Sequence, residues 1–535
     1  MNQILSKDEK SRIRQRIFIH LDGWAITPAI YQLNRLNVLD LFLKQSKWSI
    51  KNINKLIQAN EGYLNVALRT LSSQGYLICE TCNELDEITY QVTENGKQAF
   101  ILANHYNMFF DLMSSFSVRP KNIIGKNSNI KDLENAWTHS QTLLQVNKNR
   151  IIHRMNIHME GILIGPILVG LGITNKIDLL DENTPLSYLK LGLSERTFTF
   201  FIGILSKMGF ISIDKNKYFL NPKGIYYFSL STAYGVTISY LPTFANLDIL
   251  LKGDPNKIWK VSKNEHEKHV YRHMNVWGSG GAHKGYFKYI DKIIINIFNQ
   301  DIDKQPKGII DVGCGDGTLI SHVYEVILTK TQRGEMIKKY PLFVIGIDFN
   351  EKAQTDTRKR LKIKNIDAVV EFGDISNPDA INKMLIDKYR IELGELLNMR
   401  TFLDHNRIFE KPKEVKLSCF SEGSFAYRGR RIPNNEVFEN LSNHFKKWSP
   451  YLQNHGLIII ELHSINPKKS SENIGKTLST AYESTHGYTD QYIIELSCFL
   501  NAIKISGLQA VDENSRYFPN KEIATVSIQL IKNVS

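Results

Sequence analysis

The sequence lacks the features that would place the protein in a membrane or outside the cell. Residues 1–16 are polar, which argues against a signal peptide. The longest apolar stretch, residues 161–173, is broken by glycine and proline and is shorter than the roughly 18 residues that argue for a membrane span. The chain also has no block of five or six like charges that would mark a disordered tail. We therefore expect a cytoplasmic protein that does not associate with a membrane.

Cysteine is scarce as well. The chain has five, and an odd number spread along a long sequence argues against a disulfide framework. Cys79 and Cys82 form a lone CxxC. A structural zinc site needs a second pair of ligands, so we interpret these two cysteines as neighbours on a strand.

Length and charge set further limits. At 535 residues the chain exceeds what one hydrophobic core usually holds, so we expect two or three domains. The net charge of +13 is compatible with binding to nucleic acid, to an anionic membrane surface or to an acidic protein partner. The lysines are spread through a composition rich in asparagine and isoleucine, which favours an ordinary solvated surface.

The first half of the chain contains an internal repeat. The pattern Leu-Ser-x-x-Gly-aromatic occurs at residues 71–76 and again at 205–210, and a strand-like segment ending in glycine follows each copy at 90–96 and 218–224. Helices followed by a two-stranded wing are typical of winged-helix modules. From the first copy to the second, the Leu-Ser-x-x-Gly-aromatic pattern and the strand-like segment are shifted by nearly the same number of residues. This agreement indicates one module used twice.

Winged-helix modules often read DNA with polar side chains of their third helix. The third helices expected here are residues 61–75 and 192–209, and the second is apolar on nearly every side. We expect it to be buried between domains or subunits. DNA binding is therefore disfavoured, and the modules would act as a lid or in dimerisation.

Strand and helix patterns alternate from Gly308 onward. This alternation predicts an α/β fold with a parallel sheet wound on both faces. Ligands in such sheets bind beyond the carboxyl ends of the strands. The five expected parallel strands and two closing strands are residues 308–312, 342–348, 368–374, 395–405, 456–463, 507–513 and 524–531.

A glycine-rich loop, residues 313–317, follows the first of these strands. Glycine permits positive φ and lets a ligand lie against bare main chain. The dinucleotide fingerprint would need glycine where the chain has Thr318, and no Lys-Ser or Lys-Thr follows to hold a triphosphate. Asp348 ends the second strand, where an ionised carboxylate can accept both hydroxyls of a ribose. The pattern predicts a site for an adenosine ligand.

The segments DVGCGDG at 311–317 and GIDFN at 346–350 resemble the first two motifs of class I S-adenosylmethionine-dependent methyltransferases. The resemblance implies that Asp311 and the glycines face the methionine part of S-adenosylmethionine, Asp348 the ribose and Asp374 the adenine side. The cofactor-binding residues that it implies are Asp311, Gly313, Cys314, Gly315, Gly317, Asp348, Phe349, Asp374, Ile375 and Arg400.

Three other stretches bear on the methyl acceptor: residues 273–287, 400–407, and 461–467 with 480–492. Each is expected to place histidine on a loop at the catalytic edge of the sheet. One histidine could act as a general base near neutral pH. Alternatively, two or three histidines with Gln491 or an aspartate could bind iron, manganese or zinc. The catalytic candidates are His405, His463 and Tyr286, while His283 or His486 could simply cap a loop.

Together with the winged-helix-like segments, these stretches resemble the metal-dependent C-methyltransferase domains in loading modules of apratoxin-type and saxitoxin-type polyketide synthases. The resemblance implies that a malonyl or methylmalonyl thioester on an acyl carrier protein is methylated at carbon through an enolate. It implies that His463 and Gln491 bind Fe or Mn, with His405 as ligand or base. A basic rim would help to dock an acidic carrier protein.

The expected organisation is a first winged-helix-like module at residues 1–110, a helical region with the second module at 111–255, and a class I methyltransferase core at 256–535. Two other functions stay open. One is a metal-independent O-methyltransferase of small molecules that dimerises through a winged-helix domain, which would make the chain a homodimer. The other is a DNA-binding regulator whose methyltransferase-like domain senses its cofactor.

Overall fold

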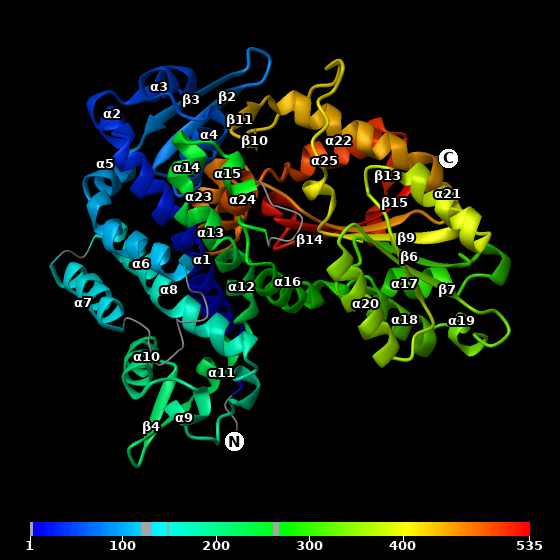
Figure 1. Cartoon of the computed structure of the whole chain (residues 1–535), viewed down its shortest axis with the longest axis horizontal. Coiled ribbons are helices and arrows are strands. Elements are labelled where there is room, and N and C mark those ends of the chain that lie inside the picture. The colour runs from blue at the N-terminus through cyan, green and yellow to red at the C-terminus, as the bar shows by residue number, and fades with distance from the viewer. Residues whose placement is uncertain (1–3, 119–129, 147–148, 260–266, 535) are drawn as a thin grey trace. The chain divides into compact units, whose positions relative to one another are not determined.

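The computed structural model describes residues 4–118, 130–146, 149–259 and 267–534 (Figure 1). The chain forms two compact units. The first comprises Met1–Ala282 together with two later segments, Arg428–Arg431 and Asn466–Thr489. The second comprises His283–Tyr427, Ile432–Ile465 and Asp490–Ser535.

The first unit contains both copies of the predicted module. In the first copy, the three-stranded sheet has the order β1-β3-β2, so β1 extends the hairpin that forms the wing. In the second copy, a bridge between Leu186 and Tyr218 occupies the place of β1. The elements of the first copy are α2 (Val38–Lys44), β1 (Lys47–Ser49), α3 (Ile50–Ile57), α4 (Glu61–Ser73), β2 (Leu77–Cys82), β3 (Glu87–Val92) and α5 (Glu94–Ile101), and those of the second are α9 (Tyr188–Leu191), α10 (Glu195–Lys207), β4 (Ile211–Asp214), β5 (Lys217–Leu220) and α11 (Pro222–Ser229).

Glycines explain why the two copies share a sequence pattern. Gly75 and Gly209 have φ of 74° and 75° and end the third helix of each copy, a left-handed conformation that glycine adopts without strain. A second pair of glycines lies in the first turn of the helix after each wing. A Cβ added at Gly96 would lie 2.0 Å from the backbone oxygen of Tyr76, and one added at Gly224 would lie 2.4 Å from that of Phe210.

The third helix α4 is buried along nearly its whole length. A helix that reads DNA must expose a face to the base edges.

Both cysteines of the CxxC motif lie on β2, as expected. No group of three or more His, Cys, Asp or Glu residues suited to a metal occurs among the described residues.

Two long helices, α1 (Lys7–Arg35) and α8 (Arg150–Ile173), pack closely in the first unit. Added Cβ atoms at Gly23 and Gly161 would each lie 2.6 Å from the facing helix backbone, so only glycine fits there. The expectation that glycine and proline break the apolar stretch is wrong, because α8 continues through Pro166. Within the described residues, α8 alone is long and apolar enough to cross a membrane, and 83% of its apolar window is buried inside the structure.

Residues 273–287 form a helix, so the expectation of a loop is wrong. Trp277 packs into the space left by Gly172 and Gly235, where an added Cβ would come within 2.1 and 2.7 Å of the indole ring. Within this helix, Gly278 packs against the backbone of Gly235 and Gly281 against Thr232, a close fit that outweighs the low helix propensity of glycine. The helix is α16 (Arg272–Phe287), whose residues up to Ala282 belong to the first unit and whose residues from His283 belong to the second. The remaining elements of the first unit are η1 (Ala103–Tyr106), α6 (Asn107–Val118), α7 (Ile130–Val146), η3 (Ile177–Leu179), α12 (Thr232–Ser239), α13 (Leu241–Ala245), α14 (Leu247–Lys252), α15 (Asn256–Trp259), α23 (Pro467–Glu472) and α24 (Ser479–Gly487).

The second unit is built on the predicted sheet, with strand order β13-β15-β12-β9-β6-β7-β8. The five strands from β12 to β8 are parallel and β15 is antiparallel to β12. β14 also pairs with β15. The predicted strands are therefore confirmed as β6 (Gly308–Val312), β7 (Phe343–Asp348), β8 (Val369–Phe372), β9 (Leu396–Thr401), β12 (Leu457–Leu462), β13 (Leu508–Ala510) and β15 (Val526–Asn533), with β14 (Arg516–Phe518) as an addition.

Helices cover both faces of this sheet (Figure 1). One face packs on a core that includes Leu385, Phe438, Trp448 and Phe499, from α21, α22 and α25. α17 and α18 lie on the other face. The bounds are α17 (Asp291–Phe298), η4 (Ile302–Lys304), α18 (Thr318–Lys330), α19 (Gln332–Glu335), α20 (Glu351–Ile363), α21 (Pro378–Tyr389), η5 (Leu393–Glu395), η6 (Asp404–Asn406), α22 (Asn434–Trp448), η7 (Ser449–Tyr451), α25 (Leu496–Ile505), η8 (Asp512–Asn514) and η9 (Lys521–Ile523). β10 (Phe425–Tyr427) also belongs to this unit, whereas Arg430 and Arg431 of its hairpin partner β11 (Arg430–Ile432) belong to the first.

One disulfide is present, although the sequence argued against a disulfide framework. Cys419 and Cys498 are bonded, with their Cα atoms 5.9 Å apart. They are separated by 79 residues in the sequence, so only the packing of α25 brings them together. Cys79, Cys82 and Cys314 are not disulfide-bonded.

Alanine at Gly96 or Gly224 should destabilise the corresponding winged-helix module. The added Cβ would overlap a backbone oxygen, and overpacking of this kind costs about 1–3 kcal/mol. Faster hydrogen exchange in the hairpin of that copy, β2 and β3 or β4 and β5, would report the loss. Gly203→Ala is the matched control, since its Cβ meets nothing within 4 Å. Unchanged exchange in both hairpins would contradict this prediction.

Candidate active site

The glycine loop turns sharply between β6 and α18. Gly313, Gly315 and Gly317 have φ of 82°, 56° and 76°. The loop is tied to β7, because the backbone N–H groups of Gly313 and Cys314 donate to the oxygen of Ile347 at 2.7 and 3.0 Å. A Cβ at Gly313 would lie 2.6 Å from the side chain of Leu403, whereas one at Gly315 would meet nothing within 4 Å. The loop therefore presents bare main chain to open space at Gly315.

Acidic residues follow three neighbouring strands at this edge. Asp348 accepts hydrogen bonds from the backbone of Gly315 at 3.0 Å and of Asn350 at 2.8 Å. Asp374 accepts one from the backbone of Ser376 at 2.8 Å. The contact with Gly315 fixes Asp348 beside the loop, where the ribose is expected, and the bond to Ser376 orients Asp374 after β8.

Asp311 is buried, and within the described part of the chain its Oδ1 atom has no hydrogen-bond partner. Burial raises the pKa of Asp311 to about 8, and the charges of Asp348 and Asp316 add to the shift. A buried carboxylate without a partner is costly unless a ligand supplies one. The ammonium group of S-adenosylmethionine would be such a partner, so these residues fit the cofactor.

The other cofactor candidates differ in their surroundings. Phe349 is 63% exposed and its ring centroid lies 5.4 Å from that of Phe372, which gives an apolar surface after β7 and β8. Cys314 and Ile375 are buried. Arg400 is also fully buried: its guanidinium lies 4.4 Å from the ring centroid of Trp448, so its side chain points into the fold.

His405 is held by a carboxylate that the sequence reasoning missed. Glu461, at the end of β12, is 1% exposed and accepts from His405 Nδ1 at 2.5 Å. It also accepts backbone hydrogen bonds from Asp404, His405 and Leu462 at 2.7, 3.2 and 2.6 Å. Because a carboxylate accepts only, Nδ1 carries the hydrogen and Nε2 carries the lone pair in the neutral ring. The signal was present in the sequence, where Glu461 stands two residues before His463.

His463 lies in the same part of the second unit. Its Nδ1 lies 3.3 Å from the backbone oxygen of Ile494, which can only accept, and its Nε2 lies 2.7 Å from Ser527 Oγ. Burial lowers the pKa of His463 to about 3; the hydrogen bond to Ile494 opposes this shift, and nearby His405 contributes to it. The ring is neutral at pH 7 and both nitrogens are engaged.

The segment that carries Gln491 lies beside both histidines. The backbone N–H of Tyr492 donates to the oxygen of His405 at 2.7 Å, and the N–H of Ser464 lies 3.3 Å from the oxygen of Ile494. The structure thus brings His405, His463 and the Gln491 segment together. It does not fit a resident metal as it stands, because the Nε2 lone pair of His463 faces the hydroxyl of Ser527 and no cluster of three His, Cys, Asp or Glu side chains occurs in the described chain.

Aromatic side chains flank this region. Tyr286 lies between Phe402 and Phe518, with ring centroids 6.0 and 5.0 Å away. Burial raises the pKa of Tyr286 to about 12, and Tyr289 adds to the shift, so its hydroxyl stays protonated at neutral pH. His283 stacks on Phe402 at 3.9 Å, and burial, with a contribution from nearby His405, lowers the pKa of His283 to about 3.

His486 was expected on a loop at the catalytic edge, but it lies in helix α24 of the first unit. Its Nδ1 is 2.6 Å from the backbone oxygen of Tyr482, one turn earlier. A cavity of about 560 Å³ in the first unit, between α7 and α10, contains none of the predicted site residues. Its lining residues are Glu134, Trp137, Glu195, Arg196, Thr199, Phe200 and Gly203.

Comparison with protein families decides the assignment of the second half. Residues 267–529 match the family model of the AprA MT2-like domain. This part of the chain is an AprA MT2-like methyltransferase domain. Residues 13–79 match the AprA N-terminal domain, and residues 160–254, which include the second winged-helix copy, match the AprA winged helix domain. The protein is therefore an S-adenosylmethionine-dependent methyltransferase with AprA-like domains.

No curated protein matches the sequence. Among solved structures, human N-acetylserotonin methyltransferase in complex with SAM is similar at 11% identity and a TM-score of 0.44, over 73% of this chain and 99% of that one. The mitomycin 7-O-methyltransferase MmcR is similar at 11% identity and a TM-score of 0.38, over 70% and 96%. The CMeT domain of the citrinin polyketide synthase is similar at 11% identity and a TM-score of 0.34, over 76% and 98%.

The AprA MT2-like domain should bind S-adenosylmethionine less tightly when Asp311 is replaced by asparagine. The change removes a buried negative charge opposite the ammonium group, and hydrogen bonds to charged groups contribute about 1.5–3 kcal/mol, so affinity should fall roughly tenfold or more. Calorimetric titration at pH 8.5 would measure it. Asp367→Asn, an exposed change in the same unit, is the control. Equal affinity of Asp311→Asn and wild type would contradict the assignment.

Asp311 should also make the stability of the ligand-free protein depend on pH. Its folded pKa of about 8 lies above the unfolded value of about 4, so the folded state retains a proton that the unfolded state loses. Stability should therefore fall as pH rises from about 4 to about 8. Asp311→Asn should unfold at a higher temperature than wild type at pH 8 and show a smaller difference at pH 5. A difference that does not change with pH would contradict the raised pKa.

Proposed function

We propose that the protein methylates the α-carbon of a malonyl or methylmalonyl thioester carried by an acyl carrier protein. The main support is the hydrogen-bonded pair of His405 and Glu461 at the ends of β9 and β12, on the same sheet edge as the cofactor loop. The AprA MT2-like family and the resemblance to polyketide loading modules support an acyl thioester as substrate. The net charge of +13 suits an acidic carrier protein.

The chemistry follows from the orientation of His405. Glu461 holds the Nδ1 hydrogen, so Nε2 can accept a proton from the weakly acidic α-carbon. The electron pair of that C–H bond becomes the enolate, whose carbon attacks the methyl group in line. The carbon–sulfur bond of the sulfonium breaks, and S-adenosylhomocysteine leaves with the electron pair. Alignment of the two reactants is the main contribution of the protein.

Tyr286 is the candidate for stabilising the enolate oxygen. A phenol that stays protonated can donate a hydrogen bond to the charge that develops in the transition state. We route no step through a metal, since the surroundings of His463 do not fit one as they stand. The metal-dependent version of the reaction, with Fe or Mn bound by His463, Gln491 and His405, would require Ser527 to release the His463 Nε2 lone pair.

Mass spectrometry of malonyl-loaded acyl carrier protein tests the proposal. Wild type with S-adenosylmethionine should add one or two methyl masses, and His405→Ala should slow the reaction by about 100-fold or more, the range for loss of a general base. His455→Ala, a change in the same unit outside the site, should leave the rate unchanged. Cofactor binding without any methyl gain would overturn the carrier-bound substrate and favour a small hydroxylated acceptor.

The same assay decides between the two versions of the chemistry. His405 as base and Tyr286 as hydrogen-bond donor need no metal, so a chelator should leave the rate of methylation unchanged. Loss of activity with chelator that iron or manganese restores would contradict the metal-free version and favour the metal-dependent one.

A further inference from the structure

The predicted site residues flank a segment from the second half of the chain that belongs to the first unit, here called the insertion. The chain leaves the second unit after Ile465 and returns to it at Asp490. The residues between them, Asn466–Thr489, belong to the first unit and form α23 and α24. His463 precedes this insertion by three residues and Gln491 follows it by two, so both flanks of the insertion carry candidate site residues.

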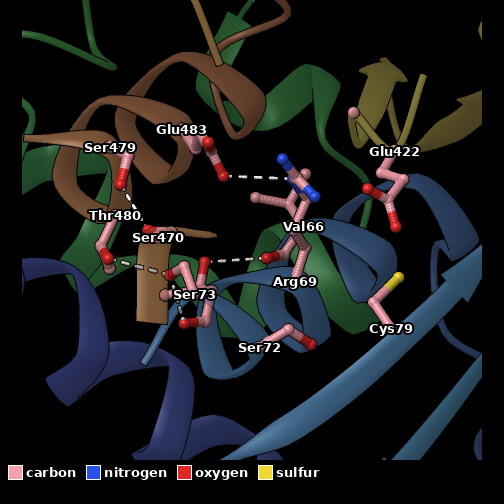
Figure 2. Close-up of polar contacts among 12 residues, drawn as sticks. Val66, Arg69, Ser72, Ser73, Cys79, Glu422, Ser470, Ser479, Thr480 and Glu483 are labelled. Carbon is pink, nitrogen blue, oxygen red and sulfur yellow. Dashed lines mark hydrogen bonds and ion pairs between the residues drawn. The ribbon is translucent and has the colours of Figure 1, made fainter. Parts of the chain in front are cut away.

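Within the first unit, the insertion packs on α4, the third helix of the first winged-helix copy (Figure 2). Arg69 Nε lies 3.1 Å from Glu483 Oε2, and both side chains are buried. Two side chains of α4 also bond to hydroxyls of α24: Thr70 to Ser484 at 2.7 Å and Ser73 to Thr480 at 2.9 Å. Contacts made by buried polar groups in one register specify a single docked position.

Small residues bring the two helices close together. A Cβ added at Gly487 would lie 2.9 Å from the Val66 side chain. Gln74, just after α4, donates a further hydrogen bond to Thr480 at 2.9 Å. Because the charges of Arg69 and Glu483 are buried, removal of one partner leaves the other charge uncompensated and destabilises the contact. These contacts with α4 therefore fix the position of α24 within the first unit.

The connections from the insertion to the site residues are short. α23 begins at Pro467, two residues after Ile465, and α24 ends at Gly487, four residues before Gln491. A residue spans at most about 3.5 Å, so neither connection can reach far. At the far side of each connection, Ser464 bonds to Ile494 and Tyr492 bonds to His405.

We propose that Arg69 and Glu483 are positioning residues for methyl transfer. The winged-helix copy at the start of the chain holds the insertion, and the insertion in turn fixes the segments that carry His463, Gln491 and the contact of Tyr492 with His405. This role rests on the proposed function in so far as those residues act on the acceptor. It gives the buried face of α4 a purpose other than DNA binding.

Hydrogen exchange of the full-length protein tests the positioning role without any substrate. In Arg69→Met, the amides of Ser464 and Tyr492 should exchange about tenfold faster or more, since their protection depends on local order. The amides of β6 and β7 should keep their protection. Arg69→Lys should retain most of the wild-type protection. Arg16→Met is the matched control, because it breaks the ion pair of Arg16 with Glu160, which lies in the same unit but outside the insertion.

Thr480→Ala is a milder second variant that keeps the ion pair and removes the bonds to Ser73 and Gln74. It should raise exchange at Tyr492 in the same direction. Where carrier methylation is observed, both variants should lower kcat by about tenfold or more, as expected when reacting groups are misplaced, with cofactor affinity unchanged. Wild-type exchange at Ser464 and Tyr492 in both Arg69→Met and Thr480→Ala would overturn the positioning role, whatever the acceptor is.

Discussion

The buried carboxylate of Glu461 is the interaction on which the candidate site depends. A carboxylate with 1% exposure would be strongly unfavourable without partners. It accepts hydrogen bonds from three backbone N–H groups and from His405, and these bonds hold the turn after β9 against the end of β12. The same bonds set the ring orientation of His405. The Glu461 carboxylate therefore determines both the position of the turn after β9 and the geometry of the proposed base, His405.

The cofactor end of the site shows the opposite arrangement. Asp311 is a buried acid whose Oδ1 has no hydrogen-bond partner in the described chain, beside a loop with three glycines at positive φ. Such an acid lowers the stability of the ligand-free fold at neutral pH. The cost is recovered when a cationic ligand binds, because the carboxylate then gains a partner. Stability is given up at Asp311 for affinity, whereas Glu461 is fully satisfied before any ligand arrives.

Local patterns predicted much of this fold. Strands β6 to β9, β12 and the repeated winged-helix pattern were visible because periodicity and glycine placement are properties of short segments. The helix α16 was missed, because its glycines Gly278 and Gly281 pack against Gly235 and Thr232, which are distant in sequence. The disulfide between Cys419 and Cys498 was missed for the same reason. In the site, His405 and His463 were anticipated from strand ends, whereas the bond between Glu461 and His405 and the docking of α24 on α4 depend on tertiary contacts.

The central claim is that the methyl group is transferred to carbon. Carbon-13 nuclear magnetic resonance tests it most directly, with S-adenosylmethionine labelled in its methyl group and a carrier-bound malonyl thioester labelled at the α-carbon. We expect a product methyl signal split by one-bond coupling to the labelled α-carbon. A methyl signal without that coupling, at the chemical shift of a methoxy group, would contradict it.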